Sequence, residues 1–174
     1  YMPYVATGNS GQYYQEALSS GPHSQVAFYN NMYGNDADSY SYTENIYDGS
    51  PLNRIVATYN AGSVFRSGNG IKSTFAYETN AGNEVLLFRV NKTISSSGDI
   101  VQSLSVSNYY NANRLYKNTM TNEDGAKVET FKDFQDRVVL ERTFGDTDNN
   151  TEHDTYYVYD DCNNLCYVLP PKLS

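Results

Sequence analysis

The feature that most constrains this chain is a degenerate repeat near its C-terminal end, in which two stretches of similar pattern each pass through an aspartate and a tight turn. The stretches are Thr121–Val138 and Asp154–Leu165. Placing Asp133 over Asp160 also aligns Asp136 with Asn163, Arg137 with Asn164 and Val138 with Leu165. In both stretches an alternating run enters a short polar turn and a second apolar run leaves it, which is the pattern of a β-hairpin. The repeat therefore predicts a strand-building unit rather than a catalytic site.

At these positions the chain resembles the YD-repeat, or RHS-repeat, family of bacteria, whose unit reads roughly Asp-Gly, a few residues, and then Tyr-x-Tyr-Asp-x-x-Gly-Arg-Leu. The residues that match one unit are Asp124, Gly125, Phe131, Asp133, Arg137 and Val138, and those that match the next are Tyr157, Tyr159, Asp160 and Leu165. Where the family has glycine after Asp-x-x, this chain has Asp136 and Asn163. These residue types best tolerate a left-handed backbone without glycine, so the turn geometry is expected to survive.

The resemblance extends upstream to about Asp48. The segments Gly49–Arg54, Glu78–Val85 and Asp154–Pro171 are similar to the region that precedes the repeats in large YD-repeat proteins of Bacteroidetes-type bacteria. The resemblance implies an N-terminal piece of a longer exported protein, at the cell surface or outside the cell, whose repeats build a hollow β-shell around a toxin-like or effector domain. The partner that it implies is the remainder of the same polypeptide.

The composition also favours strands over helices. The 174 residues include 18 Tyr and 7 Phe but no Trp, and only 18% are charged. Strands are predicted at Gln25–Tyr29, Arg54–Tyr59, Lys72–Tyr77, Val85–Val90, Val101–Val106, Leu115–Met120, Lys127–Lys132, Arg137–Thr143, Thr155–Tyr159 and Leu165–Leu169. With well-marked turns between them, they predict an all-β chain of antiparallel sheets built from hairpins, either a sandwich or a curved open sheet.

The N-terminal part contains at most one short helix, predicted at Gln12–Leu18 and ended by Ser19–Pro22. The chain then divides into three segments by pattern. Residues 1–47 form a lead-in rich in Tyr, Gly and Ser with the first strands, and residues 48–120 form a β domain that resembles the region before the repeats. Residues 121–174 form two degenerate hairpin units.

The charge excludes some partners. The formal net charge of −8 would repel a nucleic-acid backbone, and no basic stripe offsets it. The longest apolar run, Val85–Phe88, has the length of a strand and not the ~20 residues that span a bilayer. We therefore expect no nucleic-acid partner and no membrane span.

Two cysteines and one acidic loop are the candidates for cross-linking and metal binding. Cys162 and Cys166 bracket a turn, and the spacing allows either a disulfide across its base or two reduced thiols. Between Phe144 and Thr155, oxygen side chains alternate at Asp146, Asp148, Asn150 and Glu152, as in calcium loops. The glycine and the terminal Glu of such loops are missing, so a solvated acidic loop is the alternative.

Catalytic motifs are not evident. The only histidines are His23 and His153, and nothing indicates a Ser-His-Asp or Cys-His arrangement. We expect no enzymatic activity and no cofactor. A different class remains open, a cell-surface or carbohydrate-binding module that uses exposed tyrosines as stacking platforms. Tyrosines buried against cross-strand neighbours would instead favour a structural role.

The residues expected to matter are therefore structural: Gly125, Asp133, Asp136, Tyr157, Tyr159, Asp160, Asn163 and Leu165. Asp133 and Asp160 are expected to accept a hydrogen bond from the backbone two residues on and so to fix their hairpins. If the sheet of a longer protein continues past Pro171, the isolated chain has an unpaired edge, which predicts a homodimer formed through that edge.

Overall fold

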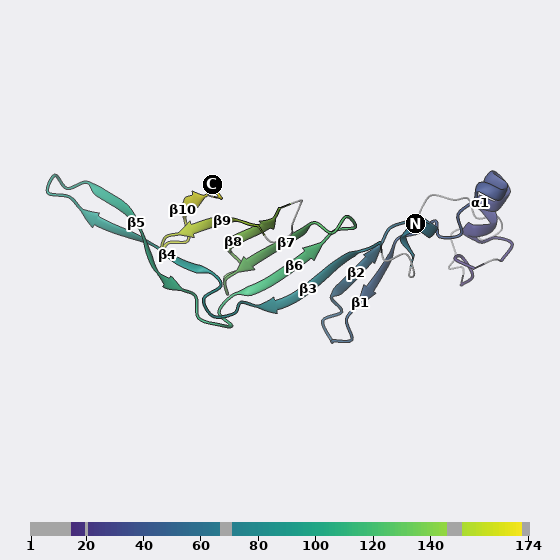
Figure 1. Ribbon diagram of the computed structural model, residues 1–174, viewed down its shortest axis with the longest axis horizontal. Helices are drawn as coiled ribbons and strands as arrows, with labels where there is room; N and C mark the ends of the chain where they lie inside the picture. Colours follow the sequence, from purple (N-terminus) through teal and green to yellow (C-terminus); the bar gives the residue numbers. More distant parts are fainter. Residues whose placement is uncertain (1–14, 20, 67–70, 146–150, 172–174) are drawn as a thin grey trace. The chain divides into compact units, whose positions relative to one another are not determined.

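A computed structural model describes residues 15–19, 21–66, 71–145 and 151–171 of the chain. The chain separates into two compact units, Tyr1–Thr74 and Phe75–Ser174. The described part is mostly β, with ten strands in antiparallel sheets and one α-helix, which confirms the all-β prediction (Figure 1). The predicted segments 1–47, 48–120 and 121–174 were drawn from sequence pattern, and that division stays a prediction.

Unit 1 contains the helix and the first strands. Its elements are α1 (Gln25–Tyr33), the 3-10 turn η1 (Gly34–Asp36), β1 (Glu44–Tyr47), β2 (Ile55–Tyr59), the 3-10 turn η2 (Ser63–Phe65) and the start of β3 (Ser73–Thr79). β1 pairs with β2, and β2 pairs with β3, both antiparallel. The unit boundary falls within β3.

The prediction of a strand at Gln25–Tyr29 is wrong, because this segment begins helix α1. The Ser24 hydroxyl accepts a hydrogen bond from Ala27 N at 3.0 Å and caps the helix. At the other end Gly34 has a φ of 58° and its N–H donates to Asn30 O. These two caps flank a helix of nine residues. They outweigh the β propensity of Val26, Phe28 and Tyr29.

The helix predicted at Gln12–Leu18 is absent from the described part of that segment, residues 15–18. Residues 15–19 form turns, and residues 12–14 lie outside the described part of the chain. The Ser19 hydroxyl donates to Glu16 O at 2.9 Å, which favours a local turn over a continued helix.

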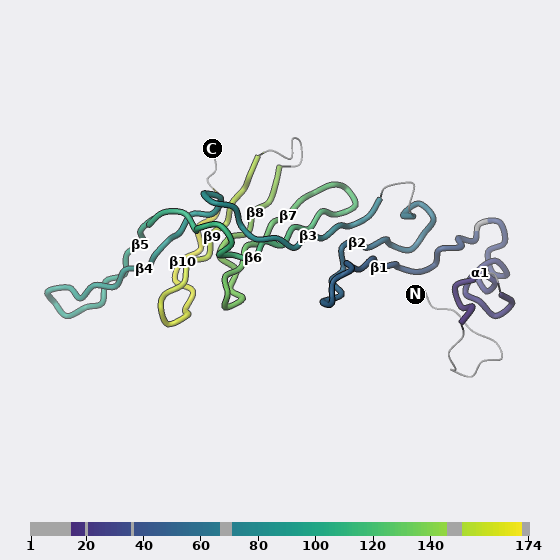
Figure 2. The backbone as a smooth tube through the Cα atoms, turned by 90° about the horizontal axis from the view of Figure 1, so that it is seen from below, coloured from purple at the N-terminus to yellow at the C-terminus, as the bar shows by residue number. Residues whose placement is uncertain are grey.

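Unit 2 is a meander of hairpins with one inserted arm. Its further strands are β4 (Leu86–Ile94), β5 (Ile100–Tyr109), β6 (Tyr116–Thr121), β7 (Lys127–Lys132), β8 (Val138–Phe144), β9 (Glu152–Tyr159) and β10 (Leu165–Leu169). The sheet runs β3-β6-β7-β8-β9-β10, and β4 and β5 form a separate two-stranded ribbon. Figure 2 shows this ribbon as an arm that leaves the sheet between β3 and β6. The other predicted strands all overlap strands of the structure, whereas β1 was not predicted.

The core of unit 2 lies on one face of this sheet. It consists of Val85, Leu115, Phe131, Val139 and Leu140, with Tyr110 and Tyr156 packed against it. Register places Phe131 opposite Leu140, and Leu140 opposite Tyr156. The segments that enter and leave the ribbon supply Val85 and Leu115 and so cover this face. The sheet is therefore held by a small core that needs the base of the ribbon.

Candidate functional site

Four hairpins of unit 2, β4–β5, β6–β7, β7–β8 and β9–β10, are closed by one recurring turn of five residues. In each turn the first residue donates its N–H to the fifth carbonyl, and the fourth residue donates its N–H to the first carbonyl. The fourth residue has a positive φ, as in a three-residue hairpin loop with a left-handed closing residue. The turns are 95–99, 122–126, 133–137 and 160–164, and their fourth residues are Gly98, Gly125, Asp136 and Asn163.

A side-chain oxygen of the first residue braces each turn. Asp133 Oδ1 accepts from Gln135 N at 2.9 Å and from Arg137 N at 3.1 Å. Asp160 Oδ1 accepts from Cys162 N at 3.0 Å and from Asn164 N at 2.8 Å. The bonds from Gln135 N and Cys162 N, two residues on, are the ones expected from the sequence, whereas the bonds from Arg137 N and Asn164 N were not predicted. The left-handed φ of Asp136 and Asn163, 62° and 68°, is the expected geometry.

Arg137 connects two neighbouring turns. Its Nε donates to Asp133 Oδ2 at 2.7 Å within its own turn. Its NH1 donates to Asn163 Oδ1 at 2.8 Å in the β9–β10 turn, and its guanidinium lies 4.9 Å from the centre of the Tyr159 ring. Burial alone would raise the pKa of Asp133, but the hydrogen bonds from Arg137 and from the backbone outweigh burial and lower it.

In the β9–β10 turn a lysine from the ribbon takes the place of the arginine. The fifth residue here is Asn164, whose Nδ2 donates to Asp160 Oδ2 at 3.2 Å. Lys92 Nζ of β4 donates to the same oxygen at 2.7 Å. The hydrogen bond from Lys92, followed by those from Asn164, holds the pKa of Asp160 far below its usual range. The ribbon is therefore fastened to the last hairpin turn.

The ribbon itself is inserted into a related turn, in which the N–H of the first residue bonds to the carbonyl one residue further on. Asn80 N donates to Leu115 O, and Asn113 N donates to Asn80 O. Asn80 Oδ1 accepts from Arg114 N at 2.9 Å and from Leu115 N at 2.8 Å, and Asn113 has a φ of 62°. Asn80 thus acts as the first residue and Asn113 as the left-handed residue of a turn that joins β3 to β6, with the whole of β4 and β5 between them.

Sequence reasoning missed this turn although a signal was present. An Asn or Asp, then Arg, then an aliphatic residue occurs at Asn53-Arg54-Ile55, at Asn113-Arg114-Leu115 and at Asp136-Arg137-Val138. In unit 1 Asn53 also has a positive φ, of 47°, and Arg54 Nε donates to Asp48 Oδ2 at 2.9 Å. The long insertion hid the second occurrence, because its turn partner Asn80 lies 33 residues upstream of Asn113.

A network of ion pairs surrounds the Phe131 ring on the core face. Lys117 Nζ lies 2.7 Å from Glu84 Oε1 and 3.2 Å from Glu129 Oε2. Arg142 binds Asp154 through two hydrogen bonds of 2.7 and 2.9 Å. The hydrogen bonds with Asp154 raise the pKa of Arg142. Each of these charges therefore has a partner of opposite sign, and the pairs join β6 to β7 and β8 to β9.

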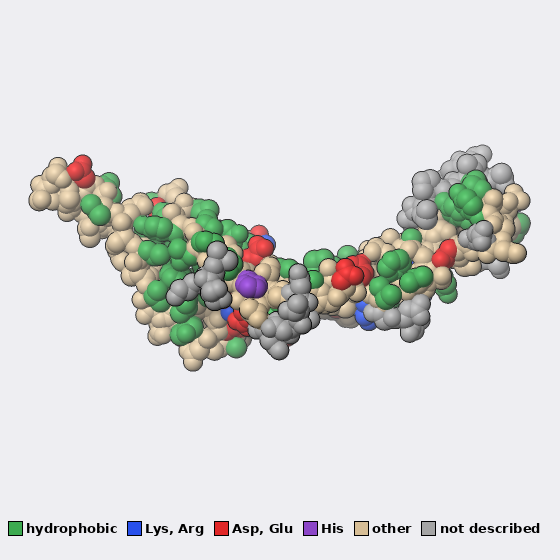
Figure 3. All heavy atoms as spheres, turned by 45° about the horizontal axis from the view of Figure 1, so that its top comes forward, with side chains coloured by type: hydrophobic (Ala, Val, Ile, Leu, Met, Phe, Trp, Pro, Cys, Tyr) green, Lys and Arg blue, Asp and Glu red, His purple; other side chains and the backbone are tan. Residues whose placement is uncertain are grey.

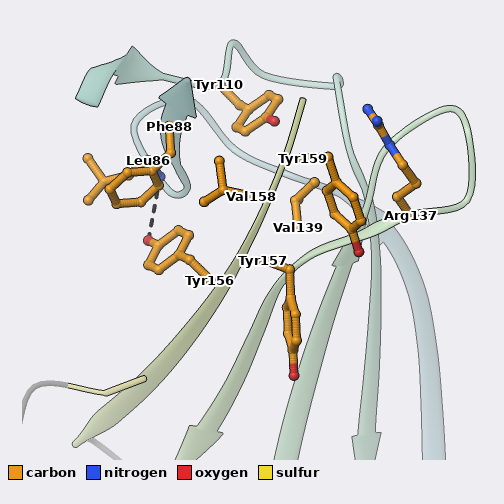
Figure 4. Close-up of a pocket in the computed structure, with 9 residues that line it drawn as sticks. All are labelled: Leu86, Phe88, Tyr110, Arg137, Val139, Tyr156, Tyr157, Val158 and Tyr159. Carbon is orange, nitrogen blue, oxygen red and sulfur yellow. Dashed lines mark hydrogen bonds between the residues drawn. The ribbon is translucent and has the colours of Figure 1, made fainter. Parts of the chain in front are cut away.

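A small hollow lies where the base of the ribbon meets β9 (Figure 4). It measures about 50 Å³ and is lined by Leu86, Phe88, Tyr110, Arg137, Val139, Tyr156, Tyr157, Val158 and Tyr159. The Tyr156 hydroxyl accepts from Leu86 N at 3.5 Å, and the Phe88 and Tyr156 rings meet edge-on with centres 4.9 Å apart. Burial raises the pKa of both Tyr110 and Tyr156. The hollow has room for one small apolar group and brings no acid and base together.

The remaining predicted structural residues lie on β9 and β10 and in the β6–β7 turn. Tyr157 and Tyr159 are half-buried and line the hollow, whereas the Leu165 side chain is exposed at the start of β10. Gly125 has a φ of 86° with open space where a Cβ would lie, so its backbone conformation, and not crowding, favours glycine there.

The two cysteines are free thiols, so the disulfide alternative does not hold in this structure. Cys162 lies within the turn, with its N–H bonded to Asp160, while Cys166 falls at the irregularity of register between Leu165 and Tyr167. The two residues therefore do not face each other across a regular pair of strands, which a disulfide would need.

Most of the calcium candidate lies outside the described part of the chain, so it stays a prediction. Asp146, Asp148 and Asn150 lie outside the described residues, and Glu152 Oε2 lies 3.2 Å from Arg142 NH2. Across the described ranges, no cluster of three or more His, Cys, Asp or Glu side chains is placed to hold a metal ion.

Comparison with known proteins gives one match. Residues 1–79 match the sequence model of a family described as Domain of unknown function (DUF6443). The matched range ends at the last residue of β3, five residues after the end of unit 1 at Thr74. No curated protein and no solved structure matches the chain. Among the described residues, no helix has the length and apolar character that crossing a membrane requires.

Proposed function

We propose that this chain is a non-enzymatic structural β-scaffold, the N-terminal part of a large YD/RHS-repeat protein. The observation that carries the proposal is the shared turn. The same braced turn closes the hairpins 133–137 and 160–164, and it recurs with an insertion between Asn80 and Asn113. A chain that closes four of its hairpins with one turn is suited to continued addition of further hairpins.

The placement of the charged groups supports a structural role. The carboxylates of Asp133 and Asp160 accept backbone N–H groups in turns, and those of Glu129 and Asp154 pair with cations across strands. A catalytic site would instead place groups of shifted pKa together in a cleft. Here the groups with shifted pKa serve the turns and the register.

In the proposed role, further repeats of the same polypeptide pair with the free edge of β10 and extend the sheet into a shell around a C-terminal effector or toxin-like domain. Leu165 and Val168 on β10 are each 50% exposed. Such exposure is expected for an edge strand that pairs with a further strand in the longer protein. The proposal includes export of the protein to the cell surface or the medium.

The test is a structure of the polypeptide extended by several repeats past Ser174, compared with the 174-residue chain. We expect a following strand to pair with β10 and the five-residue turn to recur in the added hairpins. An unpaired β10 followed by an independent domain would overturn the proposal. Fractionation of cells that produce the intact protein tests the export: recovery in the cytosol alone would contradict it.

A second candidate function, carbohydrate binding, is favoured by one feature of unit 1. A hollow of about 360 Å³ is lined by Asn35, Ala37, Asp38, Ser39, Tyr40 and Ser63, and combines an aromatic ring with amide, hydroxyl and carboxylate groups. Such a combination suits a sugar. Glycan-array binding that is lost in Tyr40→Ala and kept in Tyr116→Ala would support this candidate, and an array without signal would exclude it.

A further inference from the structure

The β4–β5 ribbon is amphipathic, and its apolar face is largely uncovered. Register places Phe88 opposite Val106, Val90 opposite Leu104 and Ile94 opposite Ile100. Because positions two apart on a strand share a face, these pairs lie on one face of the ribbon, with the pair of Lys92 and Gln102 between the last two. Ile94, Ile100 and Val106 are 78%, 70% and 57% exposed. Two strands alone are marginally stable in water, and a third or fourth strand would extend this face.

The two edges of the ribbon differ. β4 carries Arg89 and Lys92, packs against β9 through Phe88, and is bonded to the β9–β10 turn through Lys92. β5 has neither a charged residue nor a proline over its ten residues, Ile100–Tyr109. Within the described part of the chain, β5 pairs only with β4. Natural edge strands are usually protected by charge, proline or short length, and β5 has none of these. Figure 3 shows green and tan surface over most of this arm.

We propose that the outer edge of β5 is a homodimer interface, in which β5 of two copies pairs antiparallel across a two-fold axis. A strand without charges is suited to pairing with itself, because no like charges meet. An axis at Ser103 places Ile100 opposite Val106 of the second copy and Gln102 opposite Leu104. The two ribbons then form a four-stranded sheet whose apolar faces lie on one side. This inference does not depend on the scaffold proposal.

The structure favours β5 over the other uncharged edge. β10 has five residues, an irregular register after Leu165, and two prolines directly after it. β5 is paired regularly from Ile100 to Val106, and its one irregularity lies between Val106 and Asn108. A strand half as long offers fewer backbone groups for pairing, and the prolines prevent its extension. The dimer is expected to be weak, because one pair of edge strands is a small interface and the chain carries a net charge of −8.

Sedimentation velocity tests the interface over protein concentrations from about 10 µM to about 1 mM, the range of a weak equilibrium. We expect the mass of the unchanged chain to rise from monomer towards dimer. Ser103→Lys, at the exposed position on the axis, brings two like charges together and should remain a monomer throughout. The matched control Val168→Lys, exposed on β10, should dimerise like the unchanged chain. Circular dichroism checks that both variants are folded.

A monomer at every concentration, or a dimer lost in Val168→Lys and kept in Ser103→Lys, would overturn the proposal. If Ser103→Lys does not fold, hydrogen exchange of the unchanged chain decides instead. Exchange of the outward N–H groups of β5 should slow as the concentration rises, while exchange in β10 stays constant. Equal exchange of β5 at both ends of the concentration range would also contradict the interface.

Discussion

The sheet β6–β10 and the ribbon β4–β5 belong to the same unit but are stabilised differently. The sheet buries Phe131 and Leu140 completely, whereas no residue within β4 or β5 is buried. Both regions alternate apolar and polar residues, and both have hairpin turns of the same type. The difference shows that alternation and turn chemistry form a hairpin, while a covering layer gives it stability. The ribbon is held at its base by Asn80 and along β4 by Phe88 and Lys92.

The sharpest contrast is between a core residue and a ribbon residue. Phe131→Ala should lower the free energy of unfolding by about 3–5 kcal/mol, because it leaves a cavity in a core of few residues. Ile94→Ala at the exposed end of the ribbon should change it by less than about 0.5 kcal/mol. Urea unfolding followed by circular dichroism measures both. Equal effects would mean that the ribbon tip is packed in solution.

The next largest effect is expected where the ribbon joins the sheet. Asn80 is buried, and its side chain makes four hydrogen bonds to backbone groups. Asn80→Ala leaves several of these groups without partners and should cost about 2–4 kcal/mol, at about 1–3 kcal/mol for each unsatisfied group. Asn91→Ala within the ribbon is the control and should be nearly neutral. A neutral Asn80→Ala would show that the shared turn does not hold the ribbon base.

The braced turns predict a moderate effect. Asp133→Ala removes two backbone hydrogen bonds and the pair with Arg137, and should lower stability by about 1–2 kcal/mol. Asp160→Ala should also lower the melting temperature, and in addition should speed hydrogen exchange in β4, because Lys92 loses its partner. An unchanged melting temperature in either variant would contradict the structural role of its turn.

The same carboxylates predict sensitivity to acid. The pKa values of Asp133, Glu129 and Asp160 are lowered in the folded protein, so each binds its proton more readily when unfolded. Their contribution to the free energy of unfolding is complete above the pKa of the unfolded state, about 4. It is lost as the pH falls through the lower pKa values of the folded state. Melting temperatures should therefore fall between about pH 5 and pH 2. In Asp133→Asn the melting temperature should fall less over this range than in the unchanged chain. An equal fall would show that Asp133 does not contribute to the acid sensitivity.

The smallest effect concerns the left-handed residues. Asp136→Gly should raise the free energy of unfolding by a few tenths of a kcal/mol, roughly 0.5 kcal/mol at most, because glycine adopts its φ of 62° without strain. Asp136→Val should be destabilising, since a β-branched residue is strained there. Thermal unfolding of the two variants measures this, and the reverse order would mean that the turn changes conformation in solution.

The bounds of some strands could be predicted to the residue from the sequence, whereas the residues that brace the turns could be predicted only in part. β7 and β10 have the predicted bounds Lys127–Lys132 and Leu165–Leu169, since alternation and turn residues are local signals. The residues that fix the turns, Asp133 and Asp160, were also identified from their spacing. Lys92 was not identified, because no local pattern reveals that a cation 68 residues away binds Asp160. The prediction of a strand at Gln25–Tyr29 is wrong because Ser24 and Gly34 cap a helix there, and strand propensity alone does not include the effect of caps.

By itself the sequence determined where the chain turns and which residues adopt left-handed backbone, because Asn, Asp and Gly control φ within a few residues of themselves. The tertiary structure alone decided that β4 and β5 are an insertion between Asn80 and Asn113, that Lys92 replaces an arginine at Asp160, and that β5 has a free, uncharged edge. These relations join residues tens of positions apart, and they depend on which strands pair and which faces are covered. Which strands pair and which face of the sheet is buried depend on the core around Phe131, whose residues come from several strands.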